Sequence, residues 1–251
     1  MAYGIFAEVM KLKFLLLQAR GAADPMAGHE HRCFAERTGL PAERLVLHDV
    51  CSGPPPLARV RSHDALLIGG AGDYYVSKGN LPHHGALFDL IHEVIAAGHP
   101  TFGSCFGYQC LVSALGGEIV FDPDRTEVGT YALRLTDDGR RDELFGELPE
   151  RFNAQLGRKD RALSHPEGVP NLASSEASPF QALRIPGKPI WATQFHPELD
   201  RETNADRYRH YLDGYASHMS EEEKAASLDR FEDSPEASNL LRRFIEVVFG
   251  G

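Results

Sequence analysis

A cysteine between two glycines is the first candidate for chemistry in this sequence. It lies in the run Gly103-Ser104-Cys105-Phe106-Gly107, which stands between a strand-like and a helix-like segment. A sharp turn of this kind exposes the nucleophile, because the glycines avoid collisions where strand and helix close together. Free N–H groups and the dipole of the following helix favour a thiolate. We expect Cys105 to be a nucleophile, and a buried structural cysteine is the alternative.

A histidine and a glutamate could supply the base and the acid. The run Gln194-Phe195-His196-Pro197-Glu198 ends a strand-like segment. In extended backbone, the side chains of His196 and Glu198 point to the same face. The carboxylate can then orient the imidazole and stabilise its protonated form, as the acid of a Cys-His-acid triad does. An ordinary surface or core histidine is the alternative for so short a string.

A glycine-rich turn could stabilise negative charge on a substrate oxygen. The run Gly69-Gly70-Ala71-Gly72-Asp73 follows a buried strand-like segment. Its backbone can turn N–H groups toward a developing oxyanion, with the N–H of Phe106 as the second donor. A phosphate-binding loop is less consistent with this run, because the pattern G-x-x-x-x-G-K-[ST] is absent.

The elements that must position these residues alternate between strand and helix, which indicates a parallel α/β sheet. Apolar runs predict strands over 14–17, 45–50, 65–68 and 100–102, and glycine-ended periodic patterns predict helices over 29–38 and 84–97. Further β-like runs over 128–135, 180–185 and 190–195 should extend the sheet. We expect one domain over 1–251, with 200–251 a helical C-terminal extension packed on it.

Composition excludes several classes of function. The 251 residues carry 26 Lys+Arg against 36 Asp+Glu, a net charge of −10, which argues against nucleic-acid or anionic-membrane binding. The apolar run 14–17 is far shorter than the roughly 18 residues of a membrane span, and residues 1–10 show no export signal. The four cysteines lack CxxC spacing. We therefore expect a cytoplasmic protein with no metal and no cofactor.

Together the three segments resemble one family, the class I (triad-type) glutamine amidotransferases, in the branch similar to the amidotransferase domain of GMP synthase. The run G-S-C-F-G-Y-Q over 103–109 is similar to the family's G-x-C-x-G-x-Q, and Q-F-H-P-E over 194–198 to its catalytic His-Glu segment. The segment Leu172-Ala173-Ser174-Ser175-Glu176, followed by Gln181-Ala182, resembles the stretch that precedes this His-Glu segment in the family.

The resemblance implies a flavodoxin-like three-layer α/β sandwich, with a mostly parallel central sheet flanked by helices. It also implies a reaction, in which Cys105 attacks the glutamine carboxamide and forms a thioester that is hydrolysed to glutamate, with release of ammonia. His196 would move the protons and Glu198 would orient it. Gln109 would help to bind glutamine, and Gly70 and Phe106 would be the oxyanion donors.

One segment departs from the family pattern. Gly157-Arg158-Lys159-Asp160 stands where the GMP-synthase-like domains carry Ser-His-Gly-Asp. The nearby His165 is expected to face solvent. The chain also lacks a Ser-Gly-Gly-x-Asp-Ser pyrophosphatase loop and a P-loop. A separate synthetase subunit would then receive the ammonia, unless the protein acts alone as a hydrolase.

Two other functions stay open on the sequence. A γ-glutamyl peptidase would use the same triad on γ-glutamyl peptides or conjugates, with a different leaving group. A non-catalytic regulatory or partner-binding module would keep the fold without turnover, with Arg158-Lys159 marking a partner surface.

Overall fold

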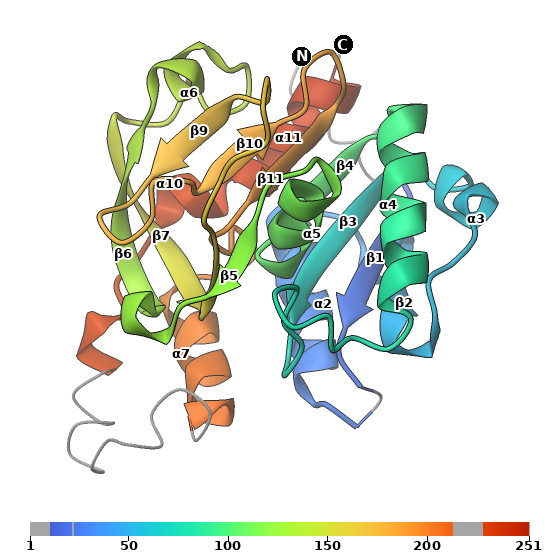
Figure 1. Ribbon diagram of the computed structural model, residues 1–251, viewed down its shortest axis with the longest axis horizontal. Coiled ribbons are helices and arrows are strands. Elements are labelled where there is room, and N and C mark those ends of the chain that lie inside the picture. The colour runs from blue at the N-terminus through green and yellow to red at the C-terminus, as the bar shows by residue number, and fades with distance from the viewer. Residues whose placement is uncertain (1–10, 22, 213–227, 251) are drawn as a thin grey trace.

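A sheet of nine strands forms the centre of the computed structural model, which describes residues 11–21, 23–212 and 228–250 (Figure 1). The strand order is β2-β1-β3-β4-β11-β10-β9-β6-β7. The strands are β1 (Phe14–Ala19), β2 (Leu45–Asp49), β3 (Ala65–Ala71), β4 (Thr101–Ser104), β6 (Glu127–Leu135), β7 (Arg151–Arg158), β9 (Asn171–Ser174), β10 (Ala182–Arg184) and β11 (Ile190–Thr193).

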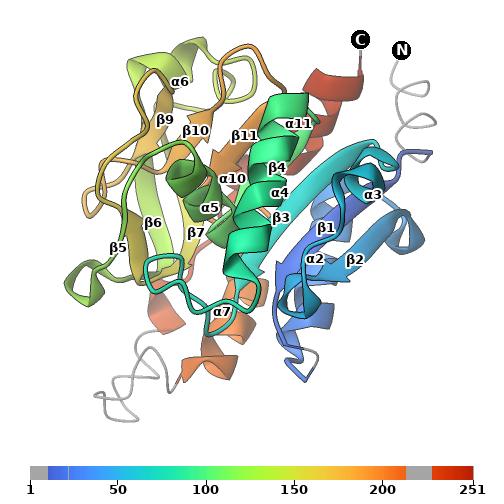
Figure 2. The ribbon, with the colours of Figure 1, turned by 45° about the vertical axis from the view of Figure 1, so that its right-hand side comes forward.

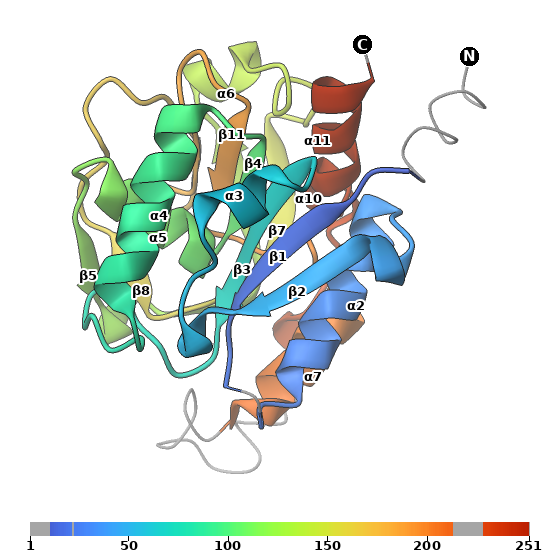
Figure 3. The same cartoon turned by 90° about the vertical axis from the view of Figure 1, so that its right-hand side faces the viewer.

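Helices cover both faces of this sheet. They are α2 (Met26–Thr38), α3 (Leu57–Arg61), α4 (His84–Ala97), α5 (Phe106–Ala114), α6 (Asp137–Arg141), α7 (Arg201–His210), α10 (Pro235–Ser238) and α11 (Leu240–Phe249), with short 3-10 helices at Ala42–Arg44, Val50–Ser52, Pro123–Arg125 and Leu228–Arg230. Figures 2 and 3 show α2 and α11 on one face of the sheet and α3, α4 and α5 on the other. The three-layer α/β sandwich predicted from the sequence is therefore confirmed.

The two halves of the sheet differ in strand direction. The strands β2, β1, β3, β4 and β11 pair in parallel. Beyond β11 the pairings are antiparallel, through β10, β9, β6 and β7. A separate two-stranded sheet joins β5 (Ile119–Phe121) to β8 (Asp160–Ala162). The segment 118–195 does extend the sheet, as predicted, through the parallel strand β11 and then through the antiparallel strands β10, β9, β6 and β7.

The core is divided by the sheet into two clusters of buried apolar side chains. One lies under α2 and α11 and includes Phe34, Phe102 and Phe244. The other lies under α4 and α5 and includes Leu66, Ile91 and Leu111. Successive side chains of a strand point to opposite faces, so both faces of a buried parallel strand are apolar and its sequence reads as a continuous apolar run.

Most predicted helices and strands are present, and where an end differs from the prediction, pairing with a neighbouring strand explains it. The helix α4 spans the predicted range and ends at Gly98, whose φ of 61° is the left-handed conformation that glycine adopts readily. The prediction that β3 ends before the glycine cluster is wrong, because parallel pairing with β1 continues as far as Ala71. The residues on which the export-signal expectation rests, 1–10, lie outside the described residues.

No helix within the described ranges is both long and apolar enough to cross a bilayer.

Candidate active site

Cys105 occupies a strained turn between β4 and α5. Its φ of 50° and ψ of −95° are unusual for a residue with a side chain, and strain of this kind persists only where the surrounding structure imposes it. The N–H of Cys105 donates to the carbonyl of Thr193 at 2.8 Å, and α5 begins at the next residue. The cysteine is therefore fixed by β11 on one side and by a helix N-terminus on the other.

The glycines on either side of the cysteine are needed for close packing. A Cβ atom on Gly107 would lie 2.5 Å from the carbonyl oxygen of Ile68, and one on Gly103 would lie 2.9 Å from the carbonyl carbon of Gly107. Real Cβ atoms essentially never come so close, and backbone cannot move aside as a flexible side chain can. The strand, the turn and the helix thus have the tight geometry that the two glycines predict.

His196 and Glu198 form a buried pair next to this turn. Nδ1 of His196 donates to Oε1 of Glu198 at 2.7 Å, and the two side chains are 4% and 0% exposed. The sequence predicts extended backbone from His196 to Glu198, but the structure differs. Instead the chain turns, and the N–H of Leu199 donates to the carbonyl of His196 at 3.2 Å. The expectation of a strand-like geometry is wrong, although the turn also brings the two side chains together.

Glu198 has three hydrogen-bond donors around its carboxylate. Besides His196, Oε2 accepts from the hydroxyl of Ser104 at 2.7 Å and Oε1 accepts from NH1 of Arg207 at 3.2 Å. Burial acts to raise the pKa of Glu198, but the charge and hydrogen bond of His196, with the charge of Arg207 and the hydrogen bond of Ser104, outweigh it and lower the pKa to about 2. Glu198 is therefore ionised at neutral pH.

The same charges hold the imidazole in its protonated form. Burial acts to lower the pKa of His196, but the charges of Glu198 and Cys105, with hydrogen bonds to both, raise the pKa to about 9. An imidazolium beside a cysteine is the arrangement in which a thiolate is stabilised as an ion pair. The turn, the imidazole and the carboxylate thus form the constellation that the sequence motifs predict.

The two predicted oxyanion donors lie in different situations. Phe106 is the first residue of α5, where an N–H group has no acceptor within the helix. Gly70 is close to the imidazole, since a Cβ built on it would lie 3.3 Å from Cε1 of His196. Its N–H, however, donates to Oε1 of the buried Glu30 at 2.9 Å. The role of Gly70 as a donor stays a prediction that requires release of this N–H.

Gln109 belongs to a chain of amide groups that ends at the thiol of Cys105. Its Nε2 donates to the carbonyl of Asp160 at 3.2 Å and to Oε1 of Gln194 at 3.3 Å. Nε2 of Gln194 in turn approaches Sγ of Cys105 at 3.6 Å. Gln109 therefore lies at the site, and its contact with a substrate stays a prediction.

The departure from the family pattern has a structural explanation at Arg158. Its side chain is buried in an ion pair with Glu127, the first residue of β6. The same carboxylate accepts from Ser175 Oγ at 2.7 Å and from Gln181 Nε2 at 3.0 Å. The suggestion that Arg158 marks a partner surface is therefore wrong, since the guanidinium completes a buried polar cluster.

His165 also differs from the expectation. Its ring stacks on Phe180, with centroids 5.2 Å apart, and both ring nitrogens are buried. The imidazole therefore packs against the protein rather than facing solvent. Burial lowers the pKa of His165.

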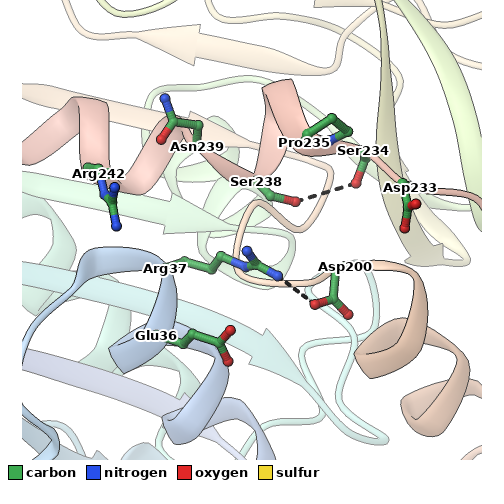
Figure 4. Close-up of a pocket in the computed structure, with 9 residues that line it drawn as sticks. All are labelled: Glu36, Arg37, Asp200, Asp233, Ser234, Pro235, Ser238, Asn239 and Arg242. Carbon is green, nitrogen blue, oxygen red and sulfur yellow. Dashed lines mark hydrogen bonds and ion pairs between the residues drawn. The ribbon is translucent and has the colours of Figure 1, made fainter.

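A separate polar cavity lies between α2, the start of α7 and the α10–α11 pair. Figure 4 shows Arg37 and Asp200 pointing toward each other across it, at 2.5 Å. The cavity has a volume of about 490 Å³, and its lining includes none of Cys105, His196 and Glu198. It is therefore distinct from the candidate active site.

Three residues next to Cys105, His196 and Glu198 are not predicted by the sequence motifs. Ser104 stands inside the cysteine motif, but its position gave no role. Glu30 lies on the same buried face of α2 as Cys33 and Phe34. A carboxylate on an apolar helix face rarely occurs without a partner, so this pattern is a signal of a buried polar contact. Arg207 comes from α7 and had no local signal, because its partners are set only by tertiary folding.

Comparison with known proteins identifies the family of this chain. Residues 58–210 match the family model described as glutamine amidotransferase class-I. The chain is 37% identical over 147 residues to a subunit of the glutamine-hydrolyzing GMP synthase of Methanocaldococcus jannaschii, covering 57% of this chain and 71% of that protein. It is 32% identical over 154 residues to the GMP synthase of Thermosipho africanus, covering 60% of this chain and 28% of that protein.

The match thus spans less than a third of the Thermosipho africanus protein. Among solved structures, a glutamine amidotransferase from Thermotoga maritima superposes with a TM-score of 0.72 at 19% identity, covering 94% of this chain and 97% of that one. A glutamine amidotransferase from Methylobacillus flagellatus gives 0.69 at 20% identity, covering 94% and 95%. At this low sequence identity, these two similarities show a shared fold alone. With the family model matching more than half of the chain, this protein belongs to the class I glutamine amidotransferases.

Proposed function

We propose that this protein hydrolyses the side-chain amide of L-glutamine to glutamate and ammonia, with Cys105, His196 and Glu198 as the catalytic triad. The observation that carries the proposal is the strained backbone of Cys105 at the start of α5, beside a buried imidazole–carboxylate pair. Membership of a family of glutamine amidotransferases supports the choice of substrate.

In the first half of the reaction, Sγ of Cys105 attacks the amide carbon of glutamine and a C–S bond forms. The amide oxygen becomes an oxyanion, which the N–H of Phe106 stabilises, joined by that of Gly70 once Glu30 releases it. The imidazolium of His196 gives its proton to the amide nitrogen, the C–N bond breaks, and ammonia leaves. A thioester on Cys105 and a neutral imidazole remain.

In the second half, His196 accepts a proton from water, and the resulting hydroxide attacks the thioester carbon. The C–S bond breaks, glutamate leaves, and the thiolate–imidazolium pair is restored. Glu198 keeps the imidazole oriented through both steps, as an acid partner does in a triad. Gln109, which lies at the site, would contact the substrate.

A separate synthetase subunit is the partner that would receive the ammonia. Support comes from the relative in Methanocaldococcus jannaschii, whose name describes one subunit of a GMP synthase. The four free cysteines, Cys33, Cys51, Cys105 and Cys110, are compatible with the reducing conditions of the cytoplasm.

We also infer that the chain forms one domain. The C-terminal helix α11 contributes Leu241, Phe244 and Ile245 to the same apolar cluster as Phe14 of β1 and Phe102 of β4. Because this cluster lies against the central strands, the described residues beyond 228 are a part of the core rather than an appendage.

The proposal is tested by measuring glutamate release from L-glutamine, from a γ-glutamyl dipeptide and from glutathione. Mass spectrometry would look for an acyl group on Cys105. The Cys105→Ala variant removes the nucleophile, and the Cys51→Ala variant is the matched control at a half-buried cysteine of the 3-10 helix Val50–Ser52. We expect glutamine to be preferred and only the Cys105→Ala variant to be inactive.

Faster cleavage of the γ-glutamyl peptides would replace the proposal by a γ-glutamyl peptidase. Turnover that survives in the Cys105→Ala variant would refute the thioester route. No turnover and no adduct with any substrate would favour a non-catalytic role.

A further inference from the structure

Arg207 lies in α7 with its guanidinium between two carboxylates from different parts of the fold. NH1 is 3.2 Å from Oε1 of Glu198, and NH2 is 3.8 Å from Oε1 of Glu30, within ion-pair range though too long for a hydrogen bond. The arginine side chain is 8% exposed and both carboxylates are 0% exposed. Charges at this depth require partners, so the placement of Arg207 is specific. Figure 3 shows α7 beside α2, the helix that carries Glu30.

Each of the two carboxylates holds a different part of the candidate active site. Glu198 accepts from Nδ1 of His196 at 2.7 Å and so fixes the imidazole. Glu30 accepts from the N–H of Gly70 at 2.9 Å and so fixes the glycine end of β3. NH1 of Arg207 also lies 3.2 Å from Nδ1 of His196, because both donors converge on the same oxygen of Glu198.

Arg207 belongs to a larger buried cluster of charged groups. Glu30 also accepts from Nε of Arg20 at 3.2 Å and from Nε2 of Gln18 at 2.9 Å. Arg20 continues the cluster toward the start of α2 and the end of α7. The positive groups are Arg20, Arg207 and His196, and the negative groups are Asp24, Glu30 and Glu198. Without Arg207, two buried carboxylates would share too little positive charge.

We infer that Arg207 is a positioning residue, which ties Glu198 to Glu30 and so sets the imidazole and the glycine end of β3 around Cys105. The inference rests on the proposed function for its kinetic consequence, since it assigns Arg207 to the machinery of that reaction. The guanidinium contacts Glu198, His196 and Glu30, and these residues in turn hold the groups around the nucleophile. Arg207 therefore acts through other residues.

The chemistry of arginine explains why this position suits it. A planar guanidinium can meet two carboxylates with two different nitrogens, whereas the ammonium of lysine is a single point charge. Replacement by lysine keeps the charge and loses the bridge. Replacement by methionine keeps much of the volume and loses both.

The test compares Arg207→Met, Arg207→Lys and the control Arg209→Met. Arg209 lies in the same helix, is exposed and pairs with Asp206 at 2.6 Å, so its replacement leaves the active site untouched. For each protein, kcat and KM for glutamine, the melting temperature and the rate of iodoacetamide modification of Cys105 would be measured, the last by peptide mass spectrometry with Cys51 as an internal reference.

We expect Arg207→Met to lower kcat by roughly 10- to 100-fold, by analogy with the loss of a residue that orients a metal-ligating histidine or carboxylate. KM should change little. Arg207→Lys should fall between the methionine variant and the wild type, and Arg209→Met should match the wild type. A folded Arg207→Met protein with wild-type kcat would overturn the inference.

Two cases need a further measurement: an Arg207→Met protein that does not fold, and a wild type that shows no glutaminase activity. If Arg207→Met does not fold, Arg207→Lys decides: a folded protein with reduced kcat supports positioning, and one with full kcat refutes it. If the wild type releases no glutamate, the proposed function fails, and the modification rates decide instead. Slower modification of Cys105 in Arg207→Met, with Cys51 unchanged, supports the inference, and equal rates refute it.

Discussion

The hydroxyl of Ser104 donates to Oε2 of Glu198 at 2.7 Å, while Oε1 of the same carboxylate accepts from the imidazole of His196 at 2.7 Å. The residue before the nucleophile is thus bonded to the acid of the proposed triad. This bond closes a ring through the turn at Cys105, the imidazole and the carboxylate. The orientation of the acid is set from the nucleophile's own strand as well as from α7.

Removing the hydroxyl of Ser104 should slow the proposed reaction without abolishing it. A hydrogen bond to a charged group contributes about 1.5–3 kcal/mol, so Ser104→Ala should reduce kcat by at least about tenfold if that stabilisation is lost in the transition state. Steady-state glutaminase kinetics would measure this. Ser113→Ala, at the half-buried end of α5, is the control. Equal kcat in both variants would show that Ser104 does not support the acid.

The pair of His196 and Glu198 should stabilise the fold over a defined pH range. Because the pKa of His196 is raised from 6.5 to about 9, its contribution is complete below pH 6.5 and is lost as pH rises through 9. Because the pKa of Glu198 is lowered from 4.5 to about 2, its contribution is present above pH 4.5 and is lost as pH falls through 2.

The difference in melting temperature between the wild type and His196→Gln should therefore be largest between pH 4.5 and 6.5. It should shrink as pH approaches 9 and beyond. Thermal unfolding over a series of buffers would measure it. A difference that stays constant from about one pH unit below 6.5 to about one above 9 would contradict the raised pKa of His196.

Gly107→Ala should destabilise the protein, because its Cβ would meet the carbonyl of Ile68 at 2.5 Å. Overpacking of this kind usually costs about 1–3 kcal/mol, and here β3 and α5 would have to separate at the active site. Gly85→Ala in α4 is the matched control, since nothing lies within 4 Å of its Cβ. Chemical denaturation would report both. If both substitutions had the same small effect, the close approach of α5 to β3 would be wrong.

Arg158→Leu should cost about 3–5 kcal/mol of folding free energy, because it leaves the buried carboxylate of Glu127 without its cation. The double variant Arg158→Leu/Glu127→Leu should recover part of this loss, since no uncompensated charge remains. Denaturant unfolding of the two proteins would test the difference. A single variant as stable as the wild type would mean that the ion pair does not hold β6 to β7.

The parts of the fold that the sequence predicted are those specified by local patterns. The helix α4 has a regular apolar face and a glycine stop, so its range could be read directly. The turn at Cys105 was predictable because its two glycines are required by sterics. The motif also predicted that His196 and Glu198 would meet, although a turn and not extended backbone brings them together.

What the sequence did not reveal depends on contacts between distant segments. Arg207 and Glu30 are far apart in the chain and come within ion-pair range, at 3.8 Å, only in the folded protein. The commitment of the Gly70 N–H to Glu30 has the same origin. Arg158 was misinterpreted because its partner, Glu127, lies on the neighbouring strand, and a pairing register cannot be inferred from a four-residue motif.

The pairing of β4 with β11 brings Ser104 opposite Thr193, so Cys105 and His196 follow the ends of adjacent strands. The sheet strands that lie between those two in the chain, β6, β7, β9 and β10, extend the sheet outward from β11. In topological terms this whole region is an insertion between two neighbouring strands that lead to the candidate active site. The inserted strands still touch the site, because the N–H of His196 donates to the carbonyl of Gln155 in β7 at 2.8 Å.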